Sequence, residues 1–171
     1  MTRYVAFLRG VNVGGVNLKM AEVAKALEAA GFSEVRTILA SGNVLLDSTS
    51  SAKKVRSTAE QALRGAFGYE AWVLVYDLPT LKKISAGYPF EREVDGHHSY
   101  VTFVSDDDLL DELAALEPGE QEKIKRGHGV LYWQVPRAAT LDSAIGKTMG
   151  KKRYKSATTT RNLRTLEKVL R

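Results

Sequence analysis

The sequence predicts an α+β protein with antiparallel sheets, and three observations lead to this class. Short apolar runs typical of buried strands alternate with segments whose apolar residues recur at helical spacing. Turn-forming residues separate these segments, and the order strand, helix, strand, strand, helix occurs twice along the chain. With 44% apolar residues among 171, the chain is expected to bury a real core.

The first half is expected to form one complete unit. Strands are predicted at residues 3–9, 35–40, 44–47 and 71–76. Apolar spacing predicts one helix over 20–30, with Asn17 as its N-cap, and another before Gly68, with Ser50 or Ser51 as its cap. The resulting order, βαββαβ, is that of a ferredoxin-like unit, in which both helices cover one face of the sheet.

The second half repeats this order after residue 98, although the two halves share no obvious residue identity. Strands are expected at 99–104, 122–125 and 130–135, with a helix after Ser105 as its cap and a last helix capped by Thr160. We therefore expect a tandem pair of ferredoxin-like (βαββαβ) units, over residues 1–76 and 77–171, the second with a basic C-terminal helical segment. Strands 4–8 and 71–76 are apolar on both faces, so the units are expected to pack through their sheets.

The composition excludes several classes of protein. The chain has no cysteine, which excludes disulfides, thiol catalysis and thiolate metal sites. No apolar run is long enough for a signal-peptide core or a membrane span. These features favour a cytoplasmic protein without membrane attachment.

A glycine-rich loop after the first strand is the first candidate site. Glycines permit positive φ angles, so that successive backbone N–H groups can turn toward one anion, and an arginine beside them would supply charge. The alternative is a purely structural turn. The candidate anion-binding residues are Arg9, Gly10, Asn12, Gly14, Gly15 and Asn17.

This loop matches neither common nucleotide-binding motif. Gly10 and Gly15 have the spacing of a P-loop, but Val16 and Asn17 replace the lysine and the hydroxyl residue. A Gly-x-Gly-x-x-Gly fingerprint is also missing. The turn at 41–43, Ser-Gly-Asn, is interpreted mainly as a hairpin turn. We expect it at the opposite edge from the glycine loop, on the assumption that the first and third strands run parallel.

The C-terminal segment carries the basic character of the chain. Residues 147–171 hold nine basic residues and one acidic residue, whereas the whole chain has a net charge of +5. Such a segment favours phosphates, nucleic acid or acidic partners, although charge runs are more often solvated surface. The residues of this second possible site are Lys151, Lys152, Lys155, Thr160, Arg161 and Asn162.

Other chemistry has little support. His97 and His98 are adjacent in a strand and His128 lies in a glycine turn, so no metal site and no cofactor are expected. No serine lies in a nucleophile elbow. The third strand, 43–47, lacks the aromatics with which RNA-recognition sheets stack bases.

Three motifs carry a resemblance to a known family. They are the glycine-rich run at 8–15, the Ser-Gly-Asn turn at 41–43, and Thr-Thr-Arg-Asn at 159–162. They resemble the marker motifs of the bacterial family of uncharacterised proteins numbered 1697 among the domains of unknown function. The resemblance spans nearly the whole chain and implies the same tandem ferredoxin-like fold, with no established activity or catalytic residue. Ala40 and Leu163 depart from the Gln and Trp that are common there.

The sequence thus favours a cytoplasmic binding protein for a phosphate-bearing ligand or nucleic acid. An enzyme acting on a phosphorylated small molecule is one alternative, with the glycine loop as a phosphate clamp. A structural or interaction protein without a ligand is the other. The oligomeric state is left open.

Overall fold

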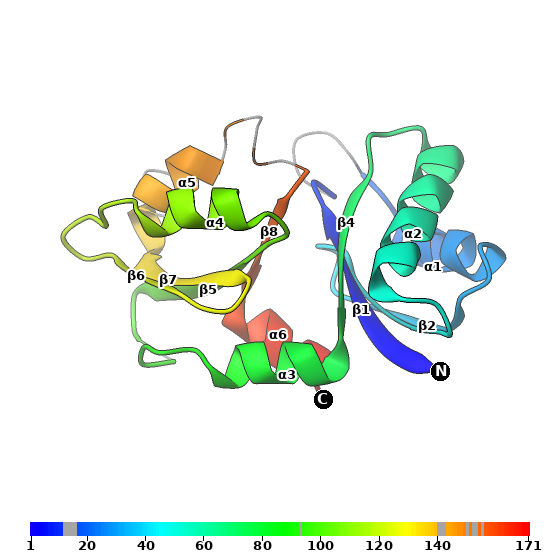
Figure 1. Ribbon diagram of the computed structural model, residues 1–171, viewed down its shortest axis with the longest axis horizontal. Coiled ribbons are helices and arrows are strands. Elements are labelled where there is room, and N and C mark those ends of the chain that lie inside the picture. The colour runs from blue at the N-terminus through cyan, green and yellow to red at the C-terminus, as the bar shows by residue number, and fades with distance from the viewer. Residues whose placement is uncertain (12–16, 93, 140–142, 150, 152–153, 155) are drawn as a thin grey trace. The chain divides into compact units, whose positions relative to one another are not determined.

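Two compact units make up the chain. The computed structural model describes residues 1–11, 17–92, 94–139, 143–149, 151, 154 and 156–171. One unit comprises residues 1–81 together with 168–171, and the other comprises residues 82–167. Each contains a four-stranded antiparallel sheet with helices (Figure 1). The predicted α+β class and antiparallel sheets are therefore confirmed.

The first unit has the element order that its sequence predicts. Its elements are β1 (Thr2–Arg9), α1 (Met20–Ala29), β2 (Ser33–Ile38), β3 (Asn43–Ser48), α2 (Ala52–Phe67) and β4 (Trp72–Asp77), after which α3 (Leu78–Ala86) begins. The strand order in the sheet is β2-β3-β1-β4, so β1 is an inner strand and β4 an outer one. Strand β1 pairs antiparallel with both β3 and β4.

Both faces of β1 are buried. Tyr4, Ala6 and Leu8 belong to a core that also contains the inward residues of α1 and α2. Val5 and Phe7 alternate with them along the strand and are fully buried as well. The apolar sequence predicted this double burial correctly, while the packing of the two units through their sheets stays a prediction.

Local sequence signals explain where the helices begin and end, with two corrections. Ser51 accepts a hydrogen bond from Lys54 N at 3.3 Å at the start of α2, and Gly68 ends that helix in the left-handed conformation, as predicted. The prediction that Asn17 caps α1 was wrong, because the helix begins at Met20 after an extended Lys19. Asn17 lies before the helix and is exposed.

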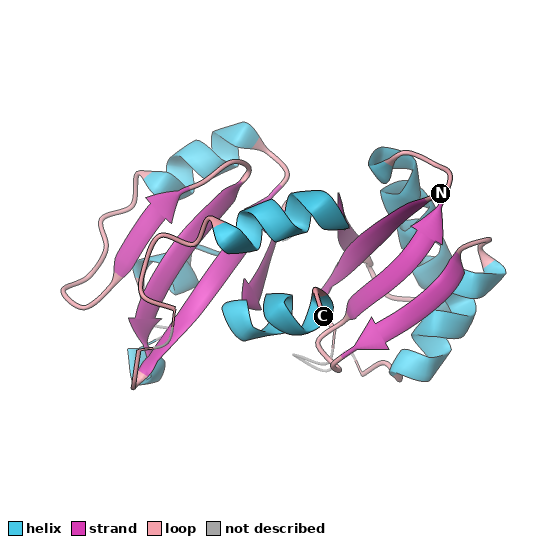
Figure 2. Cartoon of the chain, turned by 90° about the horizontal axis from the view of Figure 1, so that it is seen from below, coloured by secondary structure: helices cyan, strands magenta, loops and turns pink. Residues whose placement is uncertain are grey.

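The second unit has the same strand order. Its elements are β5 (His97–Val104), α4 (Asp107–Ala114), β6 (Lys123–Arg126), β7 (Val130–Pro136), the 3₁₀ helix η1 (Arg137–Ala139), α5 (Ala144–Met149), β8 (Thr158–Asn162) and α6 (Leu163–Val169). In the sheet order β6-β7-β5-β8, β5 and β8 hold the positions that β1 and β4 hold in the order of the first sheet. Figure 2 draws the strands of both sheets in magenta and the helices in cyan. Trp133, Leu131 and Val135 of β7 pack with Leu110 and Leu113 of α4 in its core.

Two predicted caps in this unit were wrong. Asp106, rather than Ser105, caps α4 by accepting hydrogen bonds from the backbone N–H groups of Asp108 and Leu109. Thr160 lies within β8, and the residue that caps α6 is Asn162, whose Oδ1 accepts from Arg164 N at 2.9 Å. In both cases a residue one or two positions further along offers its side-chain oxygen to the first turn.

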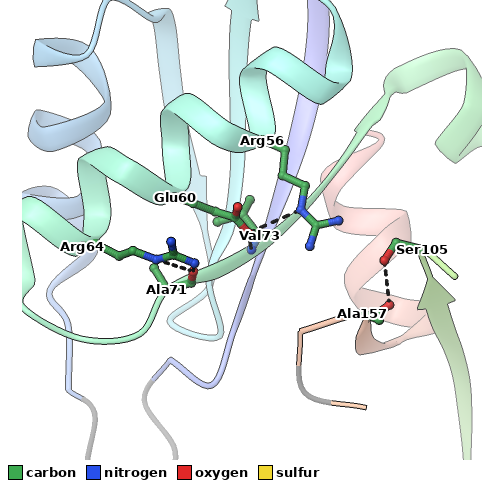
Figure 3. A network of polar contacts seen from close by, with 7 residues as sticks. All are labelled: Arg56, Glu60, Arg64, Ala71, Val73, Ser105 and Ala157. Carbon is green, nitrogen blue, oxygen red and sulfur yellow. Dashed lines mark hydrogen bonds and ion pairs between the residues drawn. The ribbon is translucent and has the colours of Figure 1, made fainter. Parts of the chain in front are cut away.

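Side chains satisfy backbone groups beside both outer strands (Figure 3). In the first unit, Glu60 Oε2 accepts from Val73 N at 3.0 Å, and Arg64 Nη2 donates to Ala71 O at 2.8 Å. In the second unit, Ala157 O accepts from Ser105 N at 2.9 Å and from Ser105 Oγ at 3.3 Å. These bonds occupy polar groups that a bare sheet edge would expose. Among the described residues, no helix has the length and apolar character needed to cross a membrane.

Candidate functional site

The glycine loop follows directly from β1. That strand ends at Arg9, and Gly10 adopts a φ of 72°, as expected of a turn glycine. Arg9 Nε is buried without a hydrogen-bond partner among the described residues, and burial lowers the pKa of the guanidinium. Asn12, Gly14 and Gly15 lie outside the described residues, so anion binding by this loop stays a prediction.

The Ser-Gly-Asn turn lies beside the start of that loop, not at the opposite edge. The expectation of parallel first and third strands was wrong, since β1 and β3 pair antiparallel with Phe7 opposite Asn43. Leu8 N donates to Gly42 O at 2.9 Å, and a Cβ on Gly42 would lie 2.8 Å from Leu8 Cβ. Two motifs distant in sequence therefore meet at one end of this sheet.

The polar groups of this turn serve the turn itself. The side chain of Asn43 is buried, and its Nδ2 donates to Ile38 O at 2.8 Å and to Ser41 Oγ at 3.0 Å. The side-chain amide of Asn43 therefore bonds within the hairpin, which agrees with the interpretation of residues 41–43 as a hairpin turn.

The C-terminal candidates separate in the structure. Thr160 Oγ1 lies 2.8 Å from Thr102 Oγ1, and the largely buried Arg161 donates from Nη1 to Thr159 Oγ1 and to Thr160 O. Lys151 is exposed, whereas Lys152 and Lys155 lie outside the described residues. Asn162 borders a pocket, whose other described lining residues were not among the predicted site residues.

This pocket lies within the second unit and has a volume of about 210 Å³. Three arginines and two histidines from separate segments border it, together with a single carboxylate among the described residues. The lining residues are Arg92, Val94, His97, His98, Ser99, Arg137, Asn162, Leu163, Arg164 and Glu167. We call it the arginine pocket.

The unequal lengths of two strands leave room for the arginine pocket. Strand β5 begins at His97, but β8 ends at Asn162 opposite Tyr100, so the first three residues of β5 extend beyond their outer partner. There the chain turns into α6, which carries Arg164 and Glu167. On the other side of β5, Arg137 follows the end of β7 and its N–H donates to Gly96 O at 2.8 Å.

Side chains hold the Arg92 segment against the sheet. Gln134 Nε2, on β7, donates to Glu91 O at 2.8 Å, and Ser99 Oγ donates to Arg92 O at 3.2 Å. The guanidinium of Arg92 donates from Nη1 to Ser85 O at 2.9 Å. These bonds fix both the backbone and the charged end of Arg92 at the border of the pocket.

Arginines outnumber carboxylates in the described lining of the pocket. Arg92 Nη2 lies 3.3 Å from Glu167 Oε1, which makes a half-exposed ion pair. Arg137 and Arg164 are exposed and bring two further guanidinium groups to its border. Guanidinium groups present planar arrays of N–H donors that suit carboxylate and phosphate oxygens. The arrangement is thus suited to an anion.

The two histidines bring titratable groups to the same place. The ring of His98 lies 5.3 Å from that of Tyr100, which in turn lies 4.6 Å from Trp133. Burial, and then the charges of Arg137 and Arg164, lower the pKa of His98. His97 Nδ1 lies 3.1 Å from Asp95 O.

Most of this site was not predicted from the sequence. His97 and His98 were considered only as metal ligands, and Arg92, Arg137 and Arg164 were not among the predicted site residues. Within the described part of the chain, no group of three His, Cys, Asp or Glu residues is arranged to hold a metal ion. The lining comes from four segments between residues 92 and 167, so no local motif marks it.

Comparisons with known proteins bear on the family and the fold. The chain is similar to the solved structure of the conserved bacterial protein SP0830 from Streptococcus pneumoniae, with 22% identity and a TM-score of 0.83 over 99% of this chain and 96% of that one. A likeness at this identity concerns the fold. The search of curated proteins finds no match. The profile of the family described as "Protein of unknown function (DUF1697)" matches residues 1–132. Since this match covers more than half of the sequence, the chain belongs to the DUF1697 family.

Proposed function

We propose that this protein binds an anionic, phosphate-bearing ligand in the arginine pocket. The observation that carries the proposal is the convergence of Arg92, Arg137 and Arg164, from three separate segments, on the border of one pocket. Grouped arginines repel one another, so a surface that collects them gains most when an anion lies between them.

A titration with inorganic phosphate tests this proposal. Isothermal titration calorimetry of the full chain is expected to give a dissociation constant of about 1 mM or tighter at low ionic strength. The affinity should fall between about 0.02 M and about 0.5 M salt, because exposed guanidiniums are screened.

A charge-matched pair of variants assigns the binding to the pocket. Arg137→Gln combined with Arg164→Gln should abolish the binding. Lys123→Gln combined with Lys125→Gln, on β6 and outside the pocket lining, removes the same charge and should leave the binding nearly unchanged. Equal effects of the two double variants would mean that net charge alone attracts phosphate.

An enzyme acting on a phosphorylated small molecule is the second candidate. The observation in its favour is that His97 and His98 border the same pocket as the arginines, where a neutral imidazole could take a proton from a bound substrate. Turnover that is lost in His98→Gln while phosphate binding persists would support an enzyme. If all pocket variants behave like the wild type, a structural protein without a ligand is favoured.

Binding of nucleic acid through the basic C-terminal segment stays a prediction, as does the cytoplasmic location. The architecture also supports a finer assignment, namely that both units are ferredoxin-like and arose as a tandem pair. Its support is the shared strand order, with an inner first strand and an outer fourth strand in each unit.

A further inference from the structure

We infer that the outer edge of β6 is a docking site for an acidic, extended segment of a partner protein, which adds to the second sheet as an antiparallel strand. Residues of β6 are not in the described lining of the arginine pocket, so this inference is independent of the proposed function. It follows from the exposure of β6, from the direction of its backbone groups and from the charges of its side chains.

Strand β6 is the outer strand best suited to accept another strand. The outer positions of the two sheets are held by β2, β4, β6 and β8. Each residue of β4 and β8 is buried or half-buried. Strand β2 is irregular, because its register with β3 shifts between Ser33 and Arg36, and Glu34 has a φ of 49°. Such irregularities hinder edge pairing. By contrast, β6 pairs with β7 in an unbroken register, and three of its four residues are exposed.

The backbone of β6 directs hydrogen-bonding groups away from its own sheet. Gly127 N donates to Val130 O at 2.8 Å, and this bond fixes the alternation of the ladder between β6 and β7. Bonded and non-bonded pairs alternate along an antiparallel ladder. The N–H and C=O groups of Ile124 and Arg126 therefore point away from β7. An added strand could pair with these groups, as in recognition by β-augmentation.

The side chains of β6 divide between the two faces of the sheet. Ile124 packs against the core that contains residues of α4, and Arg126 pairs with Asp111 of that helix. Successive side chains of a strand point to opposite faces, so Lys123 and Lys125 lie together on the other face. Both lysines are exposed, and they give this face of the edge two adjacent positive charges.

These positions specify the sequence pattern of the partner segment. Side chains directly opposite each other on paired strands have Cβ atoms about 4.5–5.5 Å apart, where opposite charges attract. Acidic residues at alternate positions of the added strand would lie opposite Lys123 and Lys125, with an apolar residue between them opposite Ile124. Lysines on an edge disfavour pairing with a second basic edge, so the same charges that oppose pairing of two β6 strands favour an acidic strand.

Nuclear magnetic resonance of the isotope-labelled full chain tests this inference. The probe is a capped peptide of sequence Glu-Val-Glu-Val-Glu, and the control peptide is Lys-Val-Lys-Val-Lys. We expect the acidic peptide to shift the amide signals of Ile124 and Arg126 and to slow the exchange of these amide protons with solvent. The basic peptide should leave these signals unchanged.

Reversal of charge on β6 tests the contribution of the lysines. Lys123→Glu combined with Lys125→Glu should weaken binding of the acidic peptide at least about ten-fold and allow the basic peptide to bind. Lys53→Glu combined with Lys54→Glu, at two exposed positions of α2, changes the net charge equally and is the matched control. This control should bind the acidic peptide nearly as the wild type does.

Methylation of the acidic peptide distinguishes strand addition from attraction between charges. In an antiparallel pair, the valines opposite Ile124 and Arg126 would use their N–H groups to bond to β6. N-methylation of the valines should therefore abolish binding. N-methylation of the glutamates, whose N–H groups would point away from β6, should be tolerated.

Four outcomes would overturn the inference. They are the absence of any shift with the acidic peptide, equal effects of the two methylation patterns, equal weakening by the two double variants, and a shift of the β6 signals by a single-stranded oligonucleotide alone. The last outcome would favour nucleic acid as the partner. Because these readouts report on β6, they leave the test of phosphate binding in the arginine pocket separate.

Discussion

The corner where β4 meets α3 in the first unit corresponds to the corner where β8 meets α6 in the second, because the two sheets share one strand order. In each, a tyrosine of the inner strand lies opposite the last residue of the outer strand, Tyr4 opposite Asp77 and Tyr100 opposite Asn162. A helix follows that residue at once. The backbone of the two corners is thus alike.

Their charges differ. In the first unit Asp77 Oδ1 accepts from Thr80 N at 2.8 Å, and nearby Arg3 is paired with Asp47 at 3.1 Å. In the second unit the neutral Asn162 takes the capping role, beside the arginines of the pocket. Both units need a side-chain cap at this corner, but only one surrounds it with arginines. The shared strand order therefore does not by itself account for the arginines at the second corner.

The largest effect on phosphate affinity is expected when the second corner is given an aspartate cap, like the first, and loses one arginine. The variant Asn162→Asp still has a side-chain oxygen that can cap α6. The variant Arg164→Gln keeps the backbone N–H that donates to this oxygen. Together these changes lower the net charge of the corner by two, because one adds a negative charge and the other removes a positive one. We expect the affinity for inorganic phosphate to fall about 100-fold, or about 2.7 kcal/mol. Calorimetry measures the affinity and urea unfolding checks the fold. Asp77→Asn in the first unit is the control and should leave phosphate binding as it was.

Two glycines that correspond in the two units should differ in the stability that they confer. Gly42 O accepts from Leu8 N and Gly129 O accepts from Val104 N, and both glycines have positive φ angles. Alanine at Gly42 would also collide with Leu8. At Gly129, apart from its chain neighbours, no heavy atom of the described residues lies within 4 Å of a Cβ. We expect losses of about 3 kcal/mol for Gly42→Ala and about 1 kcal/mol for Gly129→Ala, from denaturant midpoints. Similar losses would mean that strain in φ, rather than the close contact, sets the cost.

The backbone groups beside the outer strands offer a third contrast. Glu60→Ala leaves Val73 N–H without its partner, and we expect a loss of about 2 kcal/mol in the free energy of unfolding. In the second unit Ser105→Ala removes only the hydroxyl bond, because Ser105 N still donates to Ala157 O. That loss should be about 0.5–1 kcal/mol. A smaller effect for Glu60→Ala than for Ser105→Ala in urea unfolding would contradict this ranking.

The smallest expected effect is on the pH dependence of folding stability. The pKa of His98 is lowered below its ordinary 6.5 by burial and by Arg137 and Arg164, so the unfolded chain binds the proton more readily than the folded one. This contribution to stability is complete above about pH 6.5 and declines as the pH falls below it. Urea midpoints of the wild type should therefore fall slightly more than those of His98→Gln between about pH 7.5 and about pH 5.5. If the urea midpoints of the two proteins depended on pH in the same way, the pKa of His98 would be unchanged by folding.

The sequence predicted most of the architecture because its signals are local. Apolar runs located the strands, and Ser51 and Gly68 marked the limits of α2. Caps were less predictable, since Asp106 and Ser105 offer similar oxygens and only the backbone decides between them. The predicted parallel direction of β3 relative to β1 was wrong, because the direction of pairing depends on the whole sheet and is not encoded in either segment alone.

The site was mostly beyond prediction for the same reason. Arg92, Arg137 and Arg164 each lie alone in sequence, and only the pairing of β5 with β7 and β8 brings their segments together. The residues predicted from motifs were instead those of the glycine-rich loop and of the basic C-terminal segment. Among the described residues, Asn162 is the one predicted site residue that borders the arginine pocket. The motif that contains it, at 159–162, lies within β8.

The hydrogen bonds that fasten Arg92 have a kinetic consequence. Gln134 and Ser99 anchor the backbone around this arginine, and Ser85 holds its guanidinium before any anion arrives. An anion that binds as proposed would therefore meet a pocket wall that is already arranged, and little entropy would be lost in ordering it. Capture should proceed in one step at a rate governed by electrostatic attraction, with no slow rearrangement following the encounter.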